Sequence, residues 1–583
     1  MQFLLTALNA KYIHSNPGLY SLRKYAGENA VHVQIAEYTI NNRVEDILAD
    51  LYRRKPDAIG FSCYIWNWEM VKELVTELSK LLPGVPLWLG GPEVSFDGEK
   101  ILKEYPMLTG IMAGEGEETF AEVLDYYIKG KTEGKKLSEI AGLVIPGGRT
   151  PERALLPLTK VPFLYDGLEA FQNRIIYYES QRGCPFRCSY CLSSIDKTVR
   201  FRDISVVKKE LQFFLDKRVE QVKFVDRTFN CNHEHALSVW QYIHEHDNDI
   251  TNFHFEIAGD ILNEEEIALL HAMRPGLVQL EIGVQSTNPG TLREIRRVMD
   301  IDKLKKVVEA ILAGKNIHVH LDLIAGLPFE NYESFGHSFD EVYAMQPNQL
   351  QLGFLKVLKG SYMQEMADDY GLVYTDRPPY EVLYTNWLSY DEVCRLKKIE
   401  EMVELYYNSN QFTHTLPFLQ RVFKTPFAMY EALADFYERK GYFTETPSRI
   451  YRYQALLAFA GEWDEQKLPV YKELLTFDLY LRENVKSRPE FSNELEPFKK
   501  AILDFYKTEE RERVYLPDYA EYDSRQLARM THLEPFFYPV WEEKMDEVAC
   551  TQEPAGYILF DYRNRSPLTH EAKMMLIGKE EIV

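Results

Sequence analysis

The stretch at residues 174–191, RIIYYESQRGCPFRCSYC, decides the fold of the middle of this chain. Residues 174–180 are typical of a strand, and this strand delivers a loop that carries Cys184, Cys188 and Cys191. Thiolates at Cys-x3-Cys-x2-Cys spacing are soft ligands that can converge on one metal centre, and they favour iron–sulfur clusters, Zn²⁺ or Cu(I). A [4Fe–4S] cluster usually takes four cysteines, so a triad leaves one iron open to a substrate or cofactor.

A structural zinc knuckle is the main alternative for this loop. Structural zinc takes four closed ligands, often from two Cys-x2–4-Cys knuckles. The sequence has one knuckle, and no matching Cys or His pair follows it. A disulfide is disfavoured as well, because seven cysteines in 583 residues is a sparse and odd number that fits a reducing cytosol. The spacing therefore favours a cluster.

The cysteine loop resembles the signature of the radical S-adenosylmethionine (SAM) enzymes. The resemblance implies a [4Fe–4S] cluster on Cys184, Cys188 and Cys191, whose open iron chelates the amino and carboxylate groups of SAM. It also implies that an electron from the cluster cleaves SAM to a 5′-deoxyadenosyl radical. Tyr190, directly before the third cysteine, matches the aromatic position of that family near the adenine.

Length and charge limit the classes of partner. At 583 residues the chain is long enough for roughly two to four domains. Its formal charge of −22 makes it a poor general partner for phosphate backbones, so we expect no nucleic-acid partner. The N-terminus has no basic region and too short an apolar run for a signal peptide, and no stretch approaches about 18 uninterrupted apolar residues. We therefore expect a cytoplasmic protein without a membrane span.

Apolar runs alternate with amphipathic segments over residues 1–147. We expect an α/β fold with a Rossmann-like parallel sheet, because strand–helix alternation with buried, β-branched strands is typical of doubly wound sheets. The strands are expected at residues 2–8, 31–38, 57–65 and 85–91, and a last strand, a turn and a helix are expected over residues 110–127. Ligands of such sheets bind at the carboxyl ends of the strands. The candidate ligand-binding residues at those ends are Asn9, Ser62, Tyr64, Gly90, Gly91, Glu93, Gly114, Glu115 and Gly116.

Two of these loops resemble those of cobalamin-binding domains that precede radical SAM cores. They are GGPEVS at residues 90–95 and AGEGEETF at residues 113–120, and no G-x-G-x-x-G follows the first strand. The resemblance implies that the candidates above contact cobalamin. The residues alone leave open that the loops are ordinary tight turns. No Asp-x-His-x-x-Gly loop is present to supply an axial histidine, and His14 lies after the first strand, so we expect it at the surface or in a pocket.

A second series of strands and helices covers residues 171–380, after a connector at residues 148–170 that contains Pro and Gly. The regular spacing predicts a partial (β/α)6, TIM-like barrel, in which chemistry gathers at the C-terminal ends of the strands. The expected strand segments are residues 174–180, 219–230, 253–260, 277–286, 316–328 and 350–358.

Polar residues stand at the ends of these strands, namely Asp226, Glu256, Glu281, Gln285 and Asp322. The residues alone leave open that these are buried groups satisfied by helix N-termini and loop amides. LEIGVQS at 280–286 and HLDLIAGLP at 320–328 resemble the corresponding strands of the oxygen-independent coproporphyrinogen oxidases. That resemblance implies that Gln285 and Asp322 hold the ribose hydroxyls of SAM and that Glu256 contacts its methionyl part.

The same resemblance implies that Arg297 pairs with the SAM carboxylate, which suits the bidentate geometry of a guanidinium. Arg296 is adjacent and would replace it if the helix phase differed by one residue. The Gly-Gly-Glu that the family carries after its second strand is missing. VDRTFN stands there, at 225–230, which implies that Asp226, or the backbone near Arg227 and Thr228, meets the SAM amino group.

From residue 381 the pattern changes to long amphipathic helices, such as residues 389–410 and 426–443, with one late strand near 555–567. We expect a mainly helical domain at 381–583, which resembles an uncharacterised domain found behind cobalamin-linked radical SAM cores. The other cysteines are expected to be unliganded, except that Cys63 is either a cobalamin contact or part of the core. These unliganded cysteines are Cys231, Cys394 and Cys550.

Together these resemblances imply a cobalamin-dependent radical SAM enzyme. The radical would take a hydrogen from an unactivated carbon, and methylcobalamin would then donate a methyl group to a small-molecule or peptide substrate. An external electron donor such as a flavodoxin or ferredoxin is expected. The alternatives are a cyclisation or rearrangement by the same cofactors, and a cobalamin or redox sensor without turnover. An RNA-modifying enzyme that attaches sulfur would want a second cysteine triad and a basic tail, which the sequence lacks.

Overall fold

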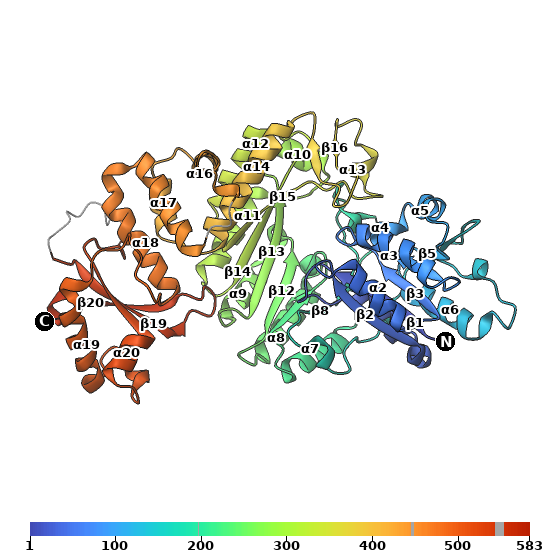
Figure 1. Ribbon diagram of the computed structural model, residues 1–583, viewed down its shortest axis with the longest axis horizontal. Helices are drawn as coiled ribbons and strands as arrows, with labels where there is room; N and C mark the ends of the chain where they lie inside the picture. The colour runs from blue at the N-terminus through green and yellow to red at the C-terminus, as the bar shows by residue number, and fades with distance from the viewer. Residues whose placement is uncertain (196–197, 445–447, 543–552, 583) are drawn as a thin grey trace. The chain divides into compact units, whose positions relative to one another are not determined.

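The structure is a computed structural model that describes residues 1–195, 198–444, 448–542 and 553–582. Two compact units make up the chain. The first unit comprises Met1–Ile317, Ile324–Tyr332 and Gly353–Tyr390. The second unit comprises His318–Leu323, Glu333–Leu352 and Asp391–Val583. Figure 1 colours the elements in chain order and labels them.

The N-terminal sheet is parallel over its first five strands, which confirms the predicted Rossmann-like fold. The strands are β1 (Phe3–Asn9), β2 (Val33–Thr39), β3 (Ala58–Ser62), β4 (Leu87–Gly90) and β5 (Gly110–Met112), in the order β2-β1-β3-β4-β5. Side chains alternate along β1, so that Phe3 and Leu5 join one apolar cluster while Leu4 and Leu8 join another. Each cluster also contains helix residues, so both faces of the sheet are covered.

The helices of this sheet divide between its two faces. Leu19 of α1 and Phe120 of α6 belong to the first cluster, and Ile47 of α2 and Val71 of α3 belong to the second. The helices are α1 (Pro17–Tyr25), α2 (Val44–Arg53), α3 (Trp68–Leu81), α4 (Pro92–Ser95), α5 (Gly98–Glu104) and α6 (Glu117–Asp125). Because all five parallel strands point the same way, the loops that follow them meet at one edge of the sheet.

A short antiparallel hairpin extends this sheet where the sequence predicts the start of a connector. It consists of β6 (Leu143–Ile145) and β7 (Gly148–Arg149), and β6 pairs with β5. The prediction that the connector begins at residue 148 was therefore wrong, because Gly148 and Arg149 form strand β7. The reason is that Gly147 and Gly148, which resemble linker residues in the sequence, both adopt positive φ in the hairpin turn.

The second sheet has six strands in the order β15-β14-β13-β12-β11-β8, as the sequence predicts for an open barrel. The pairs β8–β11, β11–β12 and β12–β13 are parallel. The strands are β8 (Ile176–Tyr178), β11 (Gln221–Phe224), β12 (Asn252–Ile257), β13 (Val278–Gln285), β14 (His318–Ala325) and β15 (Gln349–Phe354).

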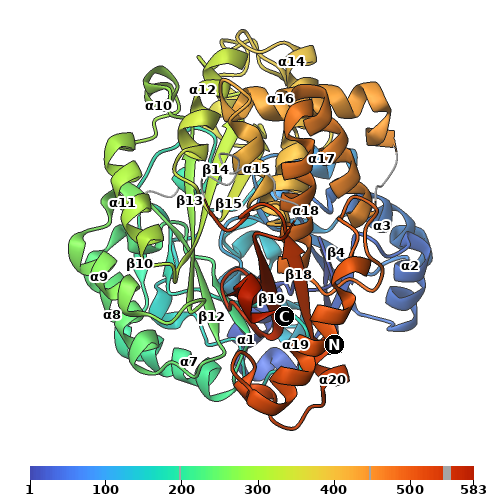
Figure 2. The ribbon, with the colours of Figure 1, turned by 90° about the vertical axis from the view of Figure 1, so that its left-hand side faces the viewer.

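Helices lie along the outside of these strands. Figure 2 shows α7 (Ile204–Asp216), α8 (His233–Glu245), α9 (Glu264–Ala272) and α11 (Ile301–Ala313) outside β12 and β13. In β13 every second residue is buried, beginning with Val278, whereas Glu281 and Gln285 belong to the other face. The remaining short elements are β9 (Gln181–Arg182), β10 (Arg200–Phe201), α10 (Pro289–Glu294), α12 (Tyr332–Tyr343), α13 (Tyr362–Glu365), β16 (Val373–Tyr374) and β17 (Val382–Tyr384).

The C-terminal region is mainly helical, as expected, but it also contains a three-stranded antiparallel sheet. The helices are α14 (Tyr390–Met402), α15 (Thr415–Gln420), α16 (Pro426–Lys440), α17 (Arg449–Trp463), α18 (Leu468–Arg482), α19 (Lys499–Glu512) and α20 (Ser524–Met530). The strands are β18 (Thr531–Phe536), β19 (Gly556–Arg565) and β20 (Ala572–Ile577), with β19 in the middle. The sequence predicted only β19, because β18 contains a proline and β20 has two Met and only one β-branched residue.

Across the described residues, no helix combines the length and the apolarity that crossing a membrane requires.

The turn after β4 requires glycine, and this requirement can be tested. Gly91 has a φ of +106°, and a Cβ there would lie 2.5 Å from the carbonyl oxygen of Cys63. Gly84 has a φ of +85° with nothing within 4 Å, so it serves as the matched control. We expect Gly84→Ala to cost about 1 kcal/mol from backbone strain and Gly91→Ala about 1–3 kcal/mol more from the clash. Unfolding midpoints of the full chain measure both, and equal losses would contradict the clash.

Candidate functional site

A buried carboxylate determines where β8 ends and the cysteine loop begins. Asp226 follows β11, is fully buried, and accepts hydrogen bonds from the backbone N–H groups of Ser180 at 2.9 Å and Gln181 at 3.1 Å. The Ser180 hydroxyl also donates to it at 2.5 Å. Burial raises the pKa of Asp226 to about 8, because the three hydrogen bonds only partly offset its desolvation. The carboxylate therefore anchors the chain immediately before the loop.

This anchoring bears on the predicted contact of Asp226 with SAM. The carboxylate oxygens are occupied by Ser180 and Gln181, which gives the side chain a structural role. The alternative contact, through the backbone near Arg227 and Thr228, stays a prediction. The Thr228 hydroxyl lies 3.4 Å from the Cys184 sulfur, so this segment does border the cysteine loop.

The cysteine loop is closed at its base by a two-stranded ribbon. Strands β9 and β10 pair antiparallel, with Arg182 opposite Arg200. Gly183 follows with a φ of +99°, and a Cβ there would lie 1.9 Å from the carbonyl oxygen of Thr198, so only glycine fits. Cys184 and Cys188 are buried and Cys191 is half-buried, and all three are free thiols.

Arg297 reaches the cysteine loop, whereas Arg296 does not. The Arg297 Nη1 lies 3.6 Å from the Cys188 sulfur and 3.4 Å from the Tyr190 hydroxyl, and the Arg297 Nη2 donates to the carbonyl oxygen of Gly283. The Arg296 guanidinium instead lies over the Tyr362 ring, 3.5 Å from its centroid. Burial raises the pKa of Tyr190 well above its usual value, although the positive charge of Arg297 opposes this. Both arginines follow the end of α10 at Glu294, and Arg296 has a φ of +57°, so the turn and not a helix phase directs Arg297 to the loop.

Gln285 ends β13 in a left-handed conformation, with a φ of +75°. A Cβ at Gly283 would lie 2.1 Å from the Gln285 Nε2 and 3.6 Å from the Arg297 Nη2, so the missing side chain leaves room for both. The Gln285 Oε1 and the Arg297 Nε are buried without a hydrogen-bond partner among the described residues. Buried polar atoms without a partner are costly, and they suit a site that a polar ligand completes.

The donor set fits the cluster and SAM that the sequence predicts. Three cysteine sulfurs come from one loop, which matches thiolate ligation of iron–sulfur clusters. Beside them lie a guanidinium with an unpartnered Nε and an amide with an unpartnered Oε1. These groups can bind a carboxylate and a hydroxyl respectively.

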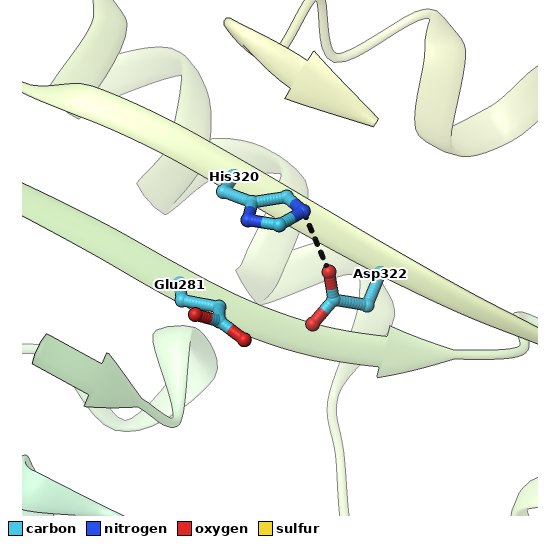
Figure 3. Close-up of side chains that lie close together, drawn as sticks. All are labelled: Glu281, His320 and Asp322. Carbon is cyan, nitrogen blue, oxygen red and sulfur yellow. Dashed lines mark ion pairs between the residues drawn. The ribbon is translucent and has the colours of Figure 1, made fainter. Parts of the chain in front are cut away.

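Other predicted SAM contacts are engaged in ion pairs. The Glu256 carboxylate lies 3.8 Å from the Arg227 guanidinium. Figure 3 shows His320 directed at Asp322, and the His320 Nε2 lies 2.9 Å from the Asp322 Oδ1. Sequence reasoning missed His320, because its position in β14 reads as one more alternating strand residue.

Glu281, which Figure 3 also labels, is paired within β11–β13. Its Oε2 lies 2.9 Å from the His254 Nε2 and 3.2 Å from the Lys223 Nζ. The sequence singled out Glu281 for its place on the strand without assigning it a ligand. The structure gives it two cationic or polar neighbours from adjacent strands, and neither was predicted.

Two cavities lie at the carboxyl edge of the N-terminal sheet. A cavity of about 150 Å³ is lined by residues that include Ser62, Tyr64, Gly90, Gly91, Gly114 and Gly116. A second, of about 320 Å³, is lined by residues that include Asn9, His14, Tyr64, Trp66, Tyr177 and Val225. The structure therefore brings most of the predicted cobalamin contacts together. It also shows that the larger cavity borders β8 and the segment after β11.

Glu93 and Glu115 were predicted as cobalamin contacts, but the structure gives their carboxylates other partners. Glu93 is 3% exposed, lies 2.8 Å from the Lys359 Nζ, and accepts a hydrogen bond from the Tyr380 hydroxyl. Glu115 pairs with Arg200 at 2.6 Å and Arg182 at 3.3 Å. These partners were not predicted, because each lies far away in the sequence.

Glu115 is held as a carboxylate. Burial alone would raise its pKa, but hydrogen bonds from the Arg200 guanidinium and the Leu156 N–H outweigh burial and lower that pKa.

His14 and the described cysteines outside the cysteine loop have ordinary surroundings. His14 lines the larger cavity, with its Nδ1 2.5 Å from the Tyr177 hydroxyl, and burial lowers its pKa. Cys63 is fully buried in the apolar core of the N-terminal sheet. Cys231 and Cys394 are half-buried free thiols. Cys550 lies outside the described residues.

Three families match successive parts of the chain. Residues 4–124 match the B12 binding domain, and residues 178–342 match the radical SAM superfamily. The chain therefore contains a B12-binding domain and a radical SAM domain. Residues 368–560 match a further family described as a protein of unknown function, DUF4080. The first two matches cover the cysteine loop and the residues named above for the two cavities, except Tyr177.

Similar proteins include a methyltransferase and a cyclase. The cobalamin-dependent radical SAM methyltransferase TokK of Streptomyces tokunonensis is 24% identical over 366 residues, which cover 56% of this chain and 51% of TokK. The anaerobic magnesium-protoporphyrin IX monomethyl ester cyclase of Rubrivivax gelatinosus is 22% identical, over 50% of this chain and 54% of the cyclase. The chain thus spans about half the length of these curated relatives.

A solved structure shares the fold. The cobalamin-dependent SAM radical enzyme OxsB, solved with aqua-cobalamin and SAM bound, superposes with a TM-score of 0.57 at 15% identity. The match covers 83% of this chain and 76% of OxsB.

The raised pKa of Asp226 predicts a pH dependence of stability. The folded chain binds the proton of the Asp226 carboxyl group more tightly than the unfolded chain does. The contribution of this protonation to the free energy of unfolding is therefore complete below a pH of about 4 and is lost as the pH rises through about 8. Asp226→Asn has no proton to lose. As the pH rises from about 4 to about 8, we expect the free energy of unfolding of Asp226→Asn to increase relative to that of the wild type, by up to about 1.4 kcal/mol per pH unit.

Asp504→Asn is the control for that measurement. Asp504 is exposed, and the hydrogen bond from Lys507 lowers its pKa. Its replacement should therefore change the pH dependence of stability in the opposite direction. Urea titrations at several pH values measure all three chains. Parallel pH curves for the wild type and Asp226→Asn would contradict a buried, easily protonated carboxyl group.

Proposed function

We propose that this chain is a cobalamin-dependent radical SAM methyltransferase that acts on an unactivated carbon. The observation that carries the proposal is the position of the cysteine loop. It lies beside the Arg297 guanidinium, in the same compact unit as the sheet whose carboxyl edge is hollowed by two cavities. When bound, the cluster and cobalamin would supply an electron for SAM cleavage and a methyl group for the substrate.

The residues around the cysteine loop would bind and orient SAM. Cys184, Cys188 and Cys191 would hold the cluster. The fork of Arg297 would bind the carboxylate of SAM, because a guanidinium presents paired donors to a planar acceptor. The unpartnered Oε1 of Gln285 would accept a hydrogen bond from a ribose hydroxyl. By resemblance, Asp322 would hold the ribose as well, Glu256 the methionyl part and Tyr190 the adenine.

The loops of the N-terminal sheet would bind cobalamin. Gly90, Gly91, Gly114 and Gly116 expose backbone to the smaller cavity and let a bulky ligand approach. Tyr64 lines both cavities and stacks on Trp66, with ring centroids 4.3 Å apart, which gives the larger cavity an aromatic wall. Since Tyr177 and Val225 of the barrel line this same cavity, it supports methyl transfer at the boundary of sheet and barrel.

A second candidate function is a cyclisation or rearrangement by the same cofactors. The similarity to the magnesium-protoporphyrin IX monomethyl ester cyclase favours it. Both functions need the same cofactor residues, so the product distinguishes them. A sensor without turnover is disfavoured, because the unpartnered groups of Arg297 and Gln285 suit a bound SAM molecule. An external electron donor such as a flavodoxin or ferredoxin is part of either proposal.

Anaerobic reconstitution tests the proposed function. The full chain is supplied with iron, sulfide and hydroxocobalamin, beside a Cys184/Cys188/Cys191→Ala variant. We expect about four irons per wild-type chain, one cobalamin, and formation of 5′-deoxyadenosine from SAM under dithionite. The variant should lose the iron and the deoxyadenosine. Zinc in place of iron, or failure to retain cobalamin, would overturn the proposal.

The type of reaction is tested with methyl-labelled SAM. A cell extract that contains the substrate is incubated with the reconstituted chain, and products are compared by mass with the triple-alanine control. Label in a product heavier by one methyl group supports methylation. A new product without label supports the second candidate instead: oxidative ring closure lowers the mass, and rearrangement leaves the mass unchanged but shifts the retention time.

The role of Arg297 is tested against its neighbour. Arg297→Lys keeps the charge but loses the planar fork, so we expect SAM to bind about 10- to 100-fold more weakly, as the loss of a charged hydrogen bond implies. Arg296→Lys is the matched control, because its guanidinium stacks on Tyr362 away from the loop. Equilibrium binding of SAM to the reconstituted chain measures both, and a larger effect at Arg296 would reverse the assignment.

A further inference from the structure

The base of the cysteine loop carries two arginines that face each other. Arg182 on β9 is paired in register with Arg200 on β10, and the loop between them contains all three cysteines. Like charges placed directly opposite in an antiparallel pair destabilise the pairing. A two-stranded ribbon as short as this one has little stability of its own. The ribbon therefore needs anions close to both guanidinium groups.

The segment after β5 of the N-terminal sheet supplies two of these anions, Glu115 and Glu117, and Glu179 after β8 supplies a third. The Glu115 Oε1 lies 2.6 Å from the Arg200 Nη2 and 3.3 Å from the Arg182 Nη1, so one oxygen bridges both arginines. The Glu117 Oε1 accepts from the Arg182 Nη2 at 2.9 Å. Glu179, next to β8, accepts from Arg182 at 2.8 and 2.9 Å. Side-chain exposures range from 7% for Glu117 to 26% for Glu179, so the pairs are largely shielded from water.

The same short segment lines the predicted cobalamin cavity. Gly114, Gly116 and Glu117 border the cavity of about 150 Å³, together with the glycines that follow β4. The Glu115 side chain leaves that segment in the direction of Arg182 and Arg200. The Leu156 N–H also donates to Glu115 at 2.7 Å, which fixes the carboxylate from a further element. Residues 114–117 thus line the predicted cobalamin cavity, and their carboxylates pair with the two arginines at the base of the cysteine loop.

We propose that Arg182 is a positioning residue that couples the two cofactor sites. A ligand in the cavity would hold residues 114–117 in place, and Glu115 and Glu117 would then keep the cysteine loop closed through Arg182 and Arg200. This inference rests on the proposed function, since it takes the cavity for cobalamin and the loop for the cluster. Coupling between binding sites is reciprocal, so the cluster tightens cobalamin binding by the same factor by which cobalamin stabilises the cluster.

Two measurements on the full chain under anaerobic conditions test the coupling. The first is the affinity for iron, obtained by titrating the reconstituted chain with a competing chelator, with and without hydroxocobalamin. The second is the Kd for hydroxocobalamin, with and without the cluster. In the wild type we expect each cofactor to tighten the other about 5- to 150-fold, the usual range of such coupling. The Arg182→Met and Glu115→Gln chains should still bind both cofactors, but the factor by which each cofactor tightens binding of the other should fall toward one.

Conservative and control variants separate coupling from general damage. Arg182→Lys should retain part of the coupling, because an ammonium group keeps the charge but cannot reach three carboxylates in the way a guanidinium does. Arg174→Met is the matched control. The Arg174 Nη1 lies 2.7 Å from the Glu37 Oε2, with similar burial, and it too joins the N-terminal sheet to the start of the barrel, away from the cysteine loop. Its coupling factors should equal those of the wild type.

The outcomes distinguish failure of this inference from failure of the proposed function. A wild-type chain that holds both cofactors with no mutual effect would overturn the coupling and leave the proposed function intact. A wild-type chain that holds no iron or no cobalamin would overturn the proposed function itself. If Arg182→Met does not fold, the isosteric Glu115→Gln decides, and unchanged coupling in that variant would overturn the role of this contact.

Discussion

The buried carboxylate of Asp226 is the contact on which the geometry of the cysteine loop depends. It accepts the two backbone N–H groups that follow β8, at the point where the chain leaves the sheet. A buried backbone N–H without an acceptor is costly, so this exit can take few other paths. The ribbon β9–β10 and the glycine at position 183 follow directly from it. Arg297, which also donates to the carbonyl oxygen of Gly283 in β13, then meets the loop at Cys188.

Charged contacts hold the N-terminal sheet to the rest of the first unit. Glu37 pairs with Arg174, Glu93 with Lys359, and Glu115 with Arg182 and Arg200. Buried ion pairs add little net stability, because desolvation offsets their attraction, but breaking one leaves an uncompensated charge. Their effect is therefore to select one arrangement of sheet and barrel. In this protein that arrangement brings the walls of the larger cavity together.

The chain uses its loops both to line cavities and to fasten elements. Glycines of the segments after β4 and β5 border the smaller cavity. The acidic residues beside them, Glu93 and Glu115, pair with side chains from distant segments instead. A loop that lines a ligand cavity and also carries an interdomain ion pair gives a ligand a route to influence structure elsewhere. Such a route requires two alternative states of the loop, whose populations the ligand shifts.

Much of the fold was predictable because the strands are apolar and regularly spaced. The parallel strands β1–β5 and the six barrel strands coincide with the predicted segments. The errors occur where local patterns are weak. Gly147 and Gly148 resemble a linker but form the turn of β6–β7, and β18 and β20 contain few strand-forming residues. Pairing partners, which the local sequence does not encode, make these segments strands.

The sequence by itself determined the order of the domains and the chemistry of the cysteine loop, because apolar periodicity and thiol spacing are local properties of the chain. Only the tertiary structure decided which arginine meets the loop. Arg296 and Arg297 are equivalent in the sequence, and a difference of one residue on the backbone sends one to Tyr362 and the other to Cys188. Only the tertiary structure showed that Glu93 and Glu115 pair with Lys359 and Arg200, because ion pairs depend on distances between segments remote in sequence.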